Sequence, residues 1–274
     1  MDTVRSNDGT PIVYERNGTG PALVLVHGTT ADHTRWQPVL PMLQQQFTVY
    51  AVDRRGRGQS GDSTAYSLER EYDDIAAVVS SIPEPVNLLG HSYGALICLE
   101  AALRVTNLNR LVLYEPSIPV GMPSYPPGAR AKIQALLDAG DREGVLLAFY
   151  RDVVEIPEHQ IAVLRKEPAW AARVAAARTI PREFSDEGYI FEPSRFKNLD
   201  VPILLLQGEN SPDYLKAATE AVHAALPNSR IVVMPGQQHI AISTAPELFA
   251  RLVIEFLLSP AESVRVRMIG GQRG

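Results

Sequence analysis

Short runs of apolar residues recur along the chain and alternate with stretches of helical periodicity. Most of the runs are continuous rather than alternating, which is typical of strands buried on both faces of a sheet. Glycine-rich or polar turns follow them, as in repeated βαβ units, so the pattern predicts an α/β fold with a mostly parallel sheet. The predicted buried strands are Ala22–Val26, Thr48–Val52, Val86–Leu89, Leu111–Tyr114, Val201–Leu206 and Arg230–Met234.

Other elements surround these strands. Residues 1–16 predict an antiparallel strand pair that turns at Asp8-Gly9. Helical periodicity separates or follows the buried strands, which is what parallel strands need for their crossover connections. The predicted helices of this part are Trp36–Gln45, Ala95–Leu103, Tyr214–Ala225 and Pro246–Leu258.

The middle of the chain follows a different pattern. From residue 117 to 196 no buried strand is predicted, and amphipathic helices follow a proline-rich segment. These helices follow the predicted strand Leu111–Tyr114, which is the sixth strand when the N-terminal pair is counted. Helices inserted at this point must lie above the carboxyl edge of the sheet. We therefore expect a core of residues 1–116 and 197–260, a helical cap of 117–196 and a flexible tail of 261–274. The predicted cap helices are Arg130–Ala139, Arg142–Val153, Pro157–Leu164 and Ala169–Arg178.

One turn between a strand and a helix carries the pattern Gly90-x-Ser92-x-Gly94. Glycines on both sides of the serine permit a sharp turn, and the serine hydroxyl is then exposed at the end of the strand. The first N–H groups of the following helix point to the same spot, where an oxyanion would form. Such a pattern also occurs in ordinary βα turns, so the assignment of Ser92 as nucleophile depends on the residues that accompany it.

Three motifs at successive strand ends resemble the α/β-hydrolase superfamily: His27-Gly28, the turn Asp53–Ser60, and Gly90–Gly94. The resemblance covers residues 10–116 and 200–258 and leaves the middle poorly matched. It implies an eight-stranded, mostly parallel sheet with helices on both faces. It also implies that Thr29 and Tyr93 supply the two backbone N–H groups of the oxyanion hole, and that the turn after residue 53 is architectural.

A serine hydroxyl needs an adjacent base, and His239 is the candidate. It follows the last strand in a Pro-Gly loop and matches the histidine position of the superfamily. The other five histidines have different predicted roles. His27 and His91 support their turns, His33 faces the substrate, and His159 and His223 lie on solvent-facing helices.

The carboxylate that orients the base has several candidates. In the superfamily it most often lies after the seventh strand, but Ser211 occupies that position here. Glu115 directly follows the sixth strand, an acid position that some members of the superfamily use. Asp213 lies in the usual loop but two residues late, where it could instead cap a helix. Glu209 is too close to the strand end, so we take Glu115 as the acid, Asp213 as the alternative, and a dyad without an acid as the third possibility.

Aromatic side chains of the predicted cap are candidates for the substrate pocket. Tyr125, Tyr150 and Trp170 are expected to line it together with His33, because a cap excludes water and shapes the site. Phe149 and Phe184 belong to the same group, although each of these aromatic residues could equally pack the cap helices together.

The composition of the chain limits the kinds of molecule that it is expected to bind. A net charge of −5 and a pI of 5.7 argue against nucleic acid and anionic membranes, so a small molecule is the expected substrate. The single cysteine, Cys98, falls in a predicted helix and is expected to pack in the core. No signal peptide, membrane span, metal cluster or dinucleotide fingerprint is found, so a cytoplasmic enzyme without metal or cofactor is expected. The sequence leaves monomer and homodimer open.

These features together predict a cofactor-independent serine hydrolase. Its substrate would be a carboxylic ester, lactone or thioester of a small, mostly apolar molecule, cleaved by Ser92, His239 and Glu115 through an acyl-enzyme. The same fold could instead perform C–C hydrolysis, acyl transfer or perhydrolysis. A third possibility is a ligand-binding receptor with low turnover that retains the triad residues.

Overall fold

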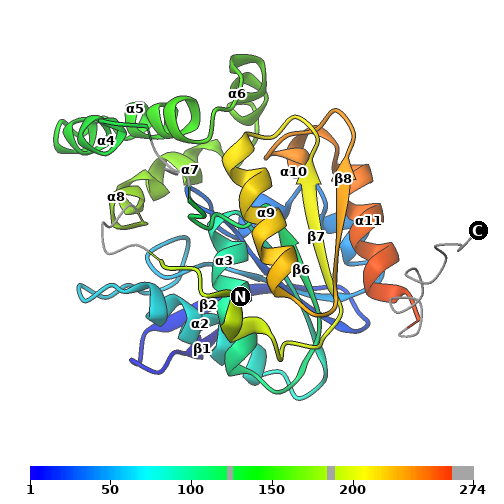
Figure 1. The fold of residues 1–274 in the computed structure, drawn as a ribbon. Coiled ribbons are helices and arrows are strands. Elements are labelled where there is room, and N and C mark those ends of the chain that lie inside the picture. Colours follow the sequence, from blue (N-terminus) through cyan, green and yellow to red (C-terminus); the bar gives the residue numbers. More distant parts are fainter. Residues whose placement is uncertain (122–125, 184–188, 261–274) are drawn as a thin grey trace, which may run out of the picture.

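The fold is built on a single eight-stranded sheet (Figure 1), seen in a computed structural model that describes residues 1–121, 126–183 and 189–260. The strand order is β1-β2-β4-β3-β5-β6-β7-β8. Strands β1 and β2 pair antiparallel with their neighbours, and all other pairs are parallel, so the predicted α/β class is confirmed. The strands are β1 (Asp2–Arg5), β2 (Pro11–Asn17), β3 (Ala22–Val26), β4 (Thr48–Val52), β5 (Val86–His91), β6 (Leu108–Tyr114), β7 (Ile203–Gly208) and β8 (Ser229–Met234).

The strand register brings the candidate site together. Val26 at the end of β3 is level with Gly90 of β5, and His91 is level with Tyr114 at the end of β6. Tyr114 in turn is level with Leu206 of β7. The loops that follow these parallel strands therefore leave the sheet at one edge, which is where open α/β sheets bind their ligands.

Helices cover both faces of the sheet and divide the apolar core into two clusters. Helices α2, α3 and α9 cover one face, while η1, α1, α10 and α11 pack against the other. Strands β3 to β7 are almost wholly buried between these layers, which explains their continuous apolar sequences. The helices are η1 (His33–Trp36), α1 (Leu40–Leu43), α2 (Leu68–Ser80), α3 (Tyr93–Ala101), η2 (Ala102–Arg104), α9 (Asp213–Ala225), α10 (Ala241–Thr244) and α11 (Pro246–Leu258).

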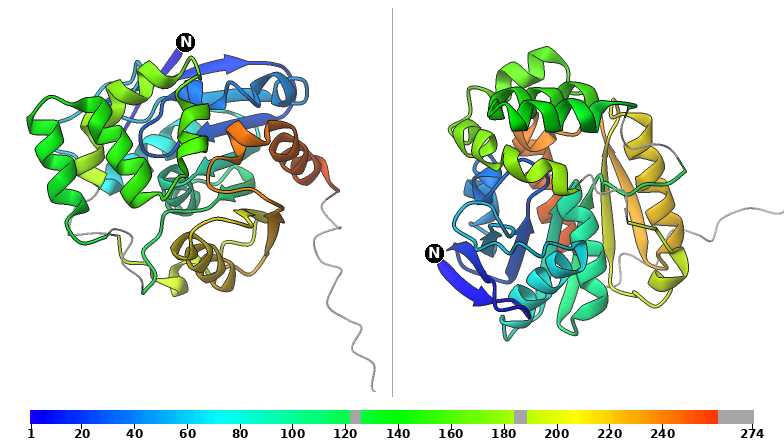
Figure 2. Two further views of the ribbon diagram at one scale, coloured as in Figure 1. Left: turned by 90° about the horizontal axis from the view of Figure 1, so that it is seen from above. Right: turned by 90° about the vertical axis from the view of Figure 1, so that its left-hand side faces the viewer.

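The segment between β6 and β7 contains helices and no strand in its described part, as predicted from its sequence. Figures 1 and 2 show these inserted helices gathered on one side of the molecule, above the sheet. They have an apolar cluster of their own, which Ile240 joins from the core. The inserted helices are α4 (Ala129–Asp138), α5 (Arg142–Ala148), η3 (Phe149–Val153), α6 (Glu158–Leu164), α7 (Trp170–Ala176), η4 (Ala177–Thr179) and α8 (Ile180–Glu183). The last helix before β7, η5 (Pro193–Phe196), lies apart from them, because Phe196 packs in the core cluster with α9.

Three helices differ from the sequence prediction. The predicted helix Trp36–Gln45 is replaced by the short elements η1 and α1, because Pro38 and Pro41 interrupt the helical hydrogen bonds. Helix α2 was not predicted, although Ser67 caps its N-terminus. The predicted helix Arg142–Val153 continues beyond α5 as the π-helical turn η3, a form that often accompanies functional sites.

Buried ion pairs tie the inserted helices to the turn after β4. Arg54 donates two hydrogen bonds of 2.7 Å to Glu71 of α2 and one of 2.6 Å to Glu183 of α8. Arg57 also pairs with Glu183, and at most 2% of each of these four side chains is exposed. The inserted helices are thus attached through charges that would be costly to leave unpaired.

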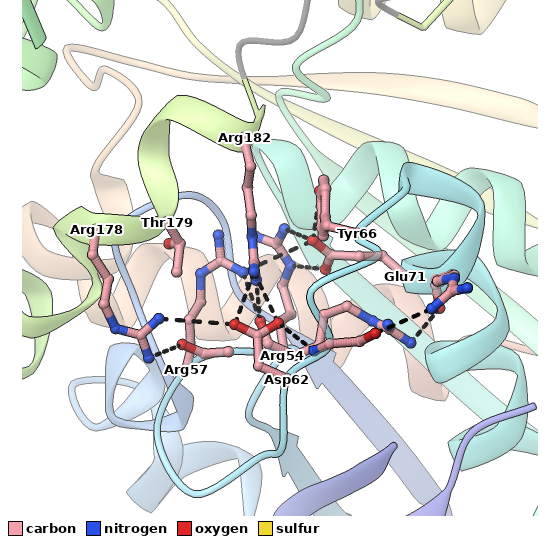
Figure 3. A network of polar contacts seen from close by, with 12 residues as sticks. Arg54, Arg57, Asp62, Tyr66, Glu71, Arg178, Thr179 and Arg182 are labelled. Carbon is pink, nitrogen blue, oxygen red and sulfur yellow. Dashed lines mark hydrogen bonds and ion pairs between the residues drawn. The ribbon is translucent and has the colours of Figure 1, made fainter. Parts of the chain in front are cut away.

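The same turn receives two arginines from the inserted helices. Arg182 donates a 2.9 Å hydrogen bond to Asp62, and Arg178 donates one of 2.8 Å to the Gly56 carbonyl (Figure 3). Only Gly, with no Cβ, fits easily at position 56, where φ is +74° and a Cβ would meet Asp62 and Arg182. The turn that the resemblance marks as architectural is therefore the attachment point of the inserted helices.

Three further residues lie where the sequence predicts them. Cys98 is fully buried in α3, and His159 and His223 are exposed, as expected. No helix in the described ranges is long and apolar enough to cross a membrane. Tyr125, Phe184 and the predicted tail 261–274 lie outside the described residues.

Candidate active site

Ser92 occupies a strained turn between β5 and α3. Its φ of 57° and ψ of −123° are unusual for a residue with a side chain, and such strain is characteristic of functional positions. Three glycines make the turn possible. A Cβ at Gly90 would lie 2.5 Å from the Gly94 carbonyl oxygen, one at Gly94 would lie 2.4 Å from the Val26 carbonyl oxygen, and one at Gly28 would lie 2.8 Å from the Ser92 Cβ. The serine is therefore held by the backbone itself.

Glu115 and His239 form a buried pair next to this turn. The Nδ1 atom of His239 lies 2.6 Å from Glu115 Oε2, and the other carboxylate oxygen accepts a 2.7 Å hydrogen bond from the Gly208 N–H. The glutamate side chain is fully buried and that of the histidine is 8% exposed. A carboxylate can only accept a hydrogen bond, so Nδ1 carries the proton and Nε2 is left with its lone pair free to accept one.

Tyr114 holds the loop that carries the histidine. Its hydroxyl donates a hydrogen bond to the Gln238 carbonyl and accepts one of 2.9 Å from the Ala241 N–H. Burial and the neighbouring Glu115 carboxylate raise the pKa of Tyr114 well above its ordinary value, so the hydroxyl keeps its proton. Two adjacent residues at the end of β6 thus fix the backbone and the ring of His239.

His91 supports the site from below rather than taking part in it. Its Nε2 lies 2.9 Å from the His239 carbonyl oxygen, and its ring lies 4.6 Å from the His239 ring and 4.8 Å from that of Tyr114. Burial lowers the pKa of His91 well below its ordinary value, and nearby His239 and Arg35 act in the same direction. A neutral ring in contact with the turn agrees with the supporting role expected from the sequence.

The other candidate acids are far less suited to orient the histidine. The side chain of Asp213, at the first position of α9, is 91% exposed and lies 4.0 Å from Lys216. Glu209 accepts a hydrogen bond from the Gly236 N–H. Ser211, at the usual acid position, is buried and its hydroxyl has no hydrogen-bond partner among the described residues. The geometry therefore favours Glu115.

A cavity opens directly above the serine. Its lining includes Ser92 and His239, together with Thr29 and Tyr93, the two residues expected to supply the oxyanion hole. Tyr93 is the first residue of α3, so the positive end of the helix dipole faces the cavity. The cavity thus brings together a hydroxyl, a base and a helix N-terminus.

The inserted helices supply the opposite wall of this cavity. Phe149 and Val153 reach it from the π-helical turn η3, and Val154 follows them. Glu183 of the buried ion-pair network also lines the cavity, and its Oε2 atom has no partner in the described part of the chain. The segment with the least resemblance to the superfamily therefore provides much of the surface that a substrate would contact.

The predicted pocket residues divide into two groups. Tyr150 lines a second cavity that adjoins the first, and its hydroxyl lies 3.1 Å from Thr30 Oγ1. His33 instead turns to Asp53, with Nδ1 2.7 Å from Oδ1, and is not part of the lining of either cavity as far as the described residues go. Trp170 packs behind Tyr150, with ring centroids 6.4 Å apart.

Asp32, His33 and Asp53 bring three potential metal-ligand atoms within 4.8 Å of one another. These atoms already have partners. Asp32 accepts a 2.9 Å hydrogen bond from the Thr34 N–H, and Asp53 accepts from both the N–H and the ring of His33. The hydrogen bond to Asp53 raises the pKa of His33. The hydrogen bonds of the cluster cap the start of η1.

Several residues around the site carry no signal in the sequence. Arg35 and Arg173 line the second cavity, and Glu183 lines the first. They lie in three different elements, so no local motif could have connected them. Tyr114 could have been suspected, because it directly precedes Glu115 at the end of a buried strand.

Comparison with known proteins agrees with this geometry. The sequence model described as "Alpha/beta hydrolase family" matches residues 23–252. The chain is 25% identical over 260 residues to 2-(acetamidomethylene)succinate hydrolase of Mesorhizobium japonicum, covering 88% of this chain and 89% of that protein. It is 27% identical over 256 residues to pimeloyl-[acyl-carrier protein] methyl ester esterase of Aeromonas hydrophila, covering 90% and 99%.

Solved structures agree with the sequence comparison. An alpha/beta hydrolase from Sphaerobacter thermophilus is 33% identical and superposes with a TM-score of 0.80, covering 93% of this chain and all of that one. The family match spans most of the chain, including the strand ends that carry Ser92, Glu115 and His239. The chain belongs to the alpha/beta hydrolase family and is a hydrolase.

Proposed function

We propose that the protein is a cofactor-independent serine hydrolase that cleaves a carboxylic ester, lactone or thioester of a small, mostly apolar molecule. The observation that carries this proposal is the buried Glu115–His239 pair, which ends in the cavity that Ser92 lines. A hydroxyl, an imidazole with a free Nε2 and a carboxylate are the three groups that acyl transfer through a serine requires.

The first half of the reaction forms an acyl-enzyme. Ser92 attacks the substrate carbonyl while His239 Nε2 takes its proton, and Glu115 stabilises the imidazolium that results. The backbone N–H groups of Thr29 and Tyr93 bind the developing oxyanion. His239 then donates its proton to the leaving alcohol or thiol, and the C–O or C–S bond breaks.

The second half releases the acid. A water molecule takes the position of the leaving group and gives a proton to His239 as it attacks the acyl carbon. The tetrahedral intermediate collapses, His239 returns the proton to Ser92, and the carboxylic acid departs.

The inserted helices act as a cap in this proposal. Phe149, Val153 and Val154 present apolar surface to the cavity from above the serine. Such a wall excludes water from the acyl-enzyme except when the attacking molecule enters, and it selects the substrate by shape. The core of residues 1–116 and 197–260 performs the chemistry, while residues 117–196 determine which ester is bound.

An assay with short-chain p-nitrophenyl esters tests the proposal. The wild-type protein should hydrolyse them, and Ser92→Ala should lower kcat by about 10⁶-fold, as for loss of a catalytic serine. Ser117→Ala is a matched control, because this serine lines the same cavity without a role in the mechanism. Hydrolysis that persists in Ser92→Ala, or that is absent from the wild type with every ester, would refute the proposal.

A further inference from the structure

A second cavity extends the candidate active site toward two buried arginines. It shares Ser92 and His239 with the first cavity and continues to Arg35 of η1 and Arg173 of α7. One arginine therefore comes from the core and the other from the inserted helices. Tyr150 belongs to the same lining.

Arg35 is buried, and no carboxylate of the described residues pairs with it. Only 2% of the residue is exposed, and its Nη1 donates a 2.6 Å hydrogen bond to the neutral Ser243 hydroxyl. Its Nη2 has no partner among the residues that the structure describes. Burial and the charge of Arg173 lower the pKa of Arg35 to about 10, so the guanidinium is still protonated at neutral pH.

Arg173 has a partner for only part of its guanidinium. Its Nη2 donates a 2.5 Å hydrogen bond to Glu167, while its Nε atom has no partner in the described chain. The residue is 4% exposed. Burial opposes its charge, yet neighbouring Tyr150 and Glu167 raise its pKa above the ordinary value.

The charges around this cavity do not balance. Among the described residues Glu167 pairs with Arg173, and no carboxylate forms an ion pair with Arg35, so one buried guanidinium lacks a direct ionic partner. Arg54, by contrast, is buried with two carboxylates, Glu71 and Glu183. Buried charge without a partner is costly, so an anion that enters the cavity beside Arg35 would be stabilised there.

We propose that Arg35 and Arg173 form a subsite for a carboxylate group of the substrate. Their free N–H groups match the oxygen atoms of a carboxylate, which guanidinium binds in a fixed geometry. This proposal rests on the proposed function and deepens it. The substrate class becomes the monoester of a short dicarboxylic acid: Ser92 attacks the ester end, and the free carboxylate binds between the two arginines.

This subsite also explains why one arginine belongs to an inserted helix. A substrate that contacts Arg35 and Arg173 together joins the core to α7 across the cavity. The bound anion supplies the counter-charge that Arg35 lacks and a second partner for Arg173, so substrates with a carboxylate should be favoured over neutral esters of the same length.

Matched substrates test the subsite directly. Initial rates are measured for the monomethyl esters of succinic, glutaric and adipic acids, and for the neutral methyl esters of butanoic, pentanoic and hexanoic acids. In the wild type, at least one acidic ester should exceed its neutral partner in kcat/KM by about 10- to 100-fold, as expected for one charged hydrogen-bonded contact. Equal values, or a preference for the neutral esters throughout, would overturn the proposal.

Variants of the two arginines test whether these side chains cause the preference for the acidic ester. Arg35→Met and Arg173→Met should each lose the preference for the acidic ester, mainly through KM, while kcat/KM for the neutral ester changes by less than about threefold. Arg251→Met, an exposed arginine of α11, is the control and should keep the wild-type preference. Equal losses on acidic and neutral esters would mean that the arginines are structural only.

An inhibition measurement needs no variant. With p-nitrophenyl acetate as reporter, glutarate should inhibit the wild type competitively and glutaramide should not. Equal inhibition by the two compounds would overturn the subsite.

The outcomes that would refute the subsite differ from those that would refute the hydrolase. If Ser92-dependent hydrolysis of neutral esters is found without any carboxylate preference, the subsite is refuted and the hydrolase stands. If no ester is hydrolysed, but glutarate alone binds in calorimetry and Arg35→Met abolishes binding, the hydrolase is refuted and the subsite stands.

Discussion

The catalytic edge and the inserted helices hold their functional groups in different ways. We use "catalytic edge" for the strand ends that carry Ser92, Glu115 and His239. There the strained turn fixes the serine, and hydrogen bonds with backbone groups fix the other two residues. The Gly208 N–H binds Glu115, and the Tyr114 hydroxyl binds the backbone on both sides of His239. The inserted helices contact the core largely through side-chain ion pairs such as Arg57–Glu183.

This difference separates two kinds of expected effect. Groups that the backbone holds cannot adjust to a lost partner, so changes at the catalytic edge should reduce turnover and leave the fold intact. Ion pairs between the inserted helices and the turn after β4 stabilise one part of the molecule on another. Changes there should reduce stability or alter the choice of substrate.

Replacement of the proposed acid should have the largest effect in this comparison. Glu115→Gln removes the charge that stabilises the imidazolium, and kcat should fall by about 10³- to 10⁴-fold, as for loss of a triad carboxylate. Asp213→Asn, at an exposed position, should change kcat by less than about twofold. Steady-state kinetics on one p-nitrophenyl ester measures both variants, and the opposite result would transfer the role to Asp213.

Removal of a buried partner from the ion-pair network should act on stability. Glu183→Ala removes the hydrogen-bonded carboxylate of Arg57, which keeps only a 3.8 Å ion pair with Glu71, and it removes one contact of Arg54. The free energy of unfolding should fall by about 3–5 kcal/mol. Glu143→Ala, in an exposed pair with Arg165, should cost less than about 1 kcal/mol. Equal losses in urea denaturation would show that the buried network does not hold the inserted helices.

The usual acid position offers a way to move the carboxylate. Ser211 is buried beside β7, and its hydroxyl is without a partner in the part of the chain described here. Adding Ser211→Asp to Glu115→Gln should restore kcat by about 10- to 100-fold, because a carboxylate then returns to the catalytic edge. Ser211→Asn in the same background is the control. No recovery with aspartate would mean that only the end of β6 can serve His239.

Two buried histidines predict the pH dependence of stability. Burial lowers the pKa of both His27 and His91 well below the ordinary value, so only the unfolded chain binds protons there below about pH 6.5. Stability should therefore fall as the pH decreases from 6.5 to 5, by about 1.4 kcal/mol per pH unit for each histidine. His33, whose pKa is raised, contributes its stability below pH 6.5 and loses it above, outside this window.

Urea denaturation between pH 6.5 and 5 measures this slope. His91→Asn should reduce the slope by the contribution of one proton, because the unfolded variant no longer binds it. A wild-type slope that His91→Asn does not alter would contradict the assignment.

The catalytic edge and the inserted helices also differ in how much of their structure could be predicted from sequence. The catalytic edge was predictable because its signals are local: buried strands are continuous apolar runs, and Ser92 lies between glycines that the turn requires. The choice of Glu115 over Asp213 followed from its position directly after a buried strand, together with the resemblance to a superfamily in which some members place their acid there.

The sequence predicts that the inserted segment is helical, but it does not predict which of its side chains meet the core. Arg35 and Arg173 meet across 138 positions of sequence, and nothing near either one indicates a common cavity. Glu183 likewise finds Arg54 through the tertiary fold, 129 residues away. Such contacts depend on the placement of whole elements, whereas a strand or a turn depends on its own few residues.

Active-site labelling tests the central claim most directly. The protein is treated with a fluorophosphonate, and the mass of the intact chain is measured before and after, followed by peptide mapping. The wild type should gain a single phosphonyl group on the peptide that contains Ser92, while Ser92→Ala should gain none. An unlabelled wild type, or equal labelling of Ser92→Ala, would contradict the claim that Ser92 is the nucleophile of this hydrolase.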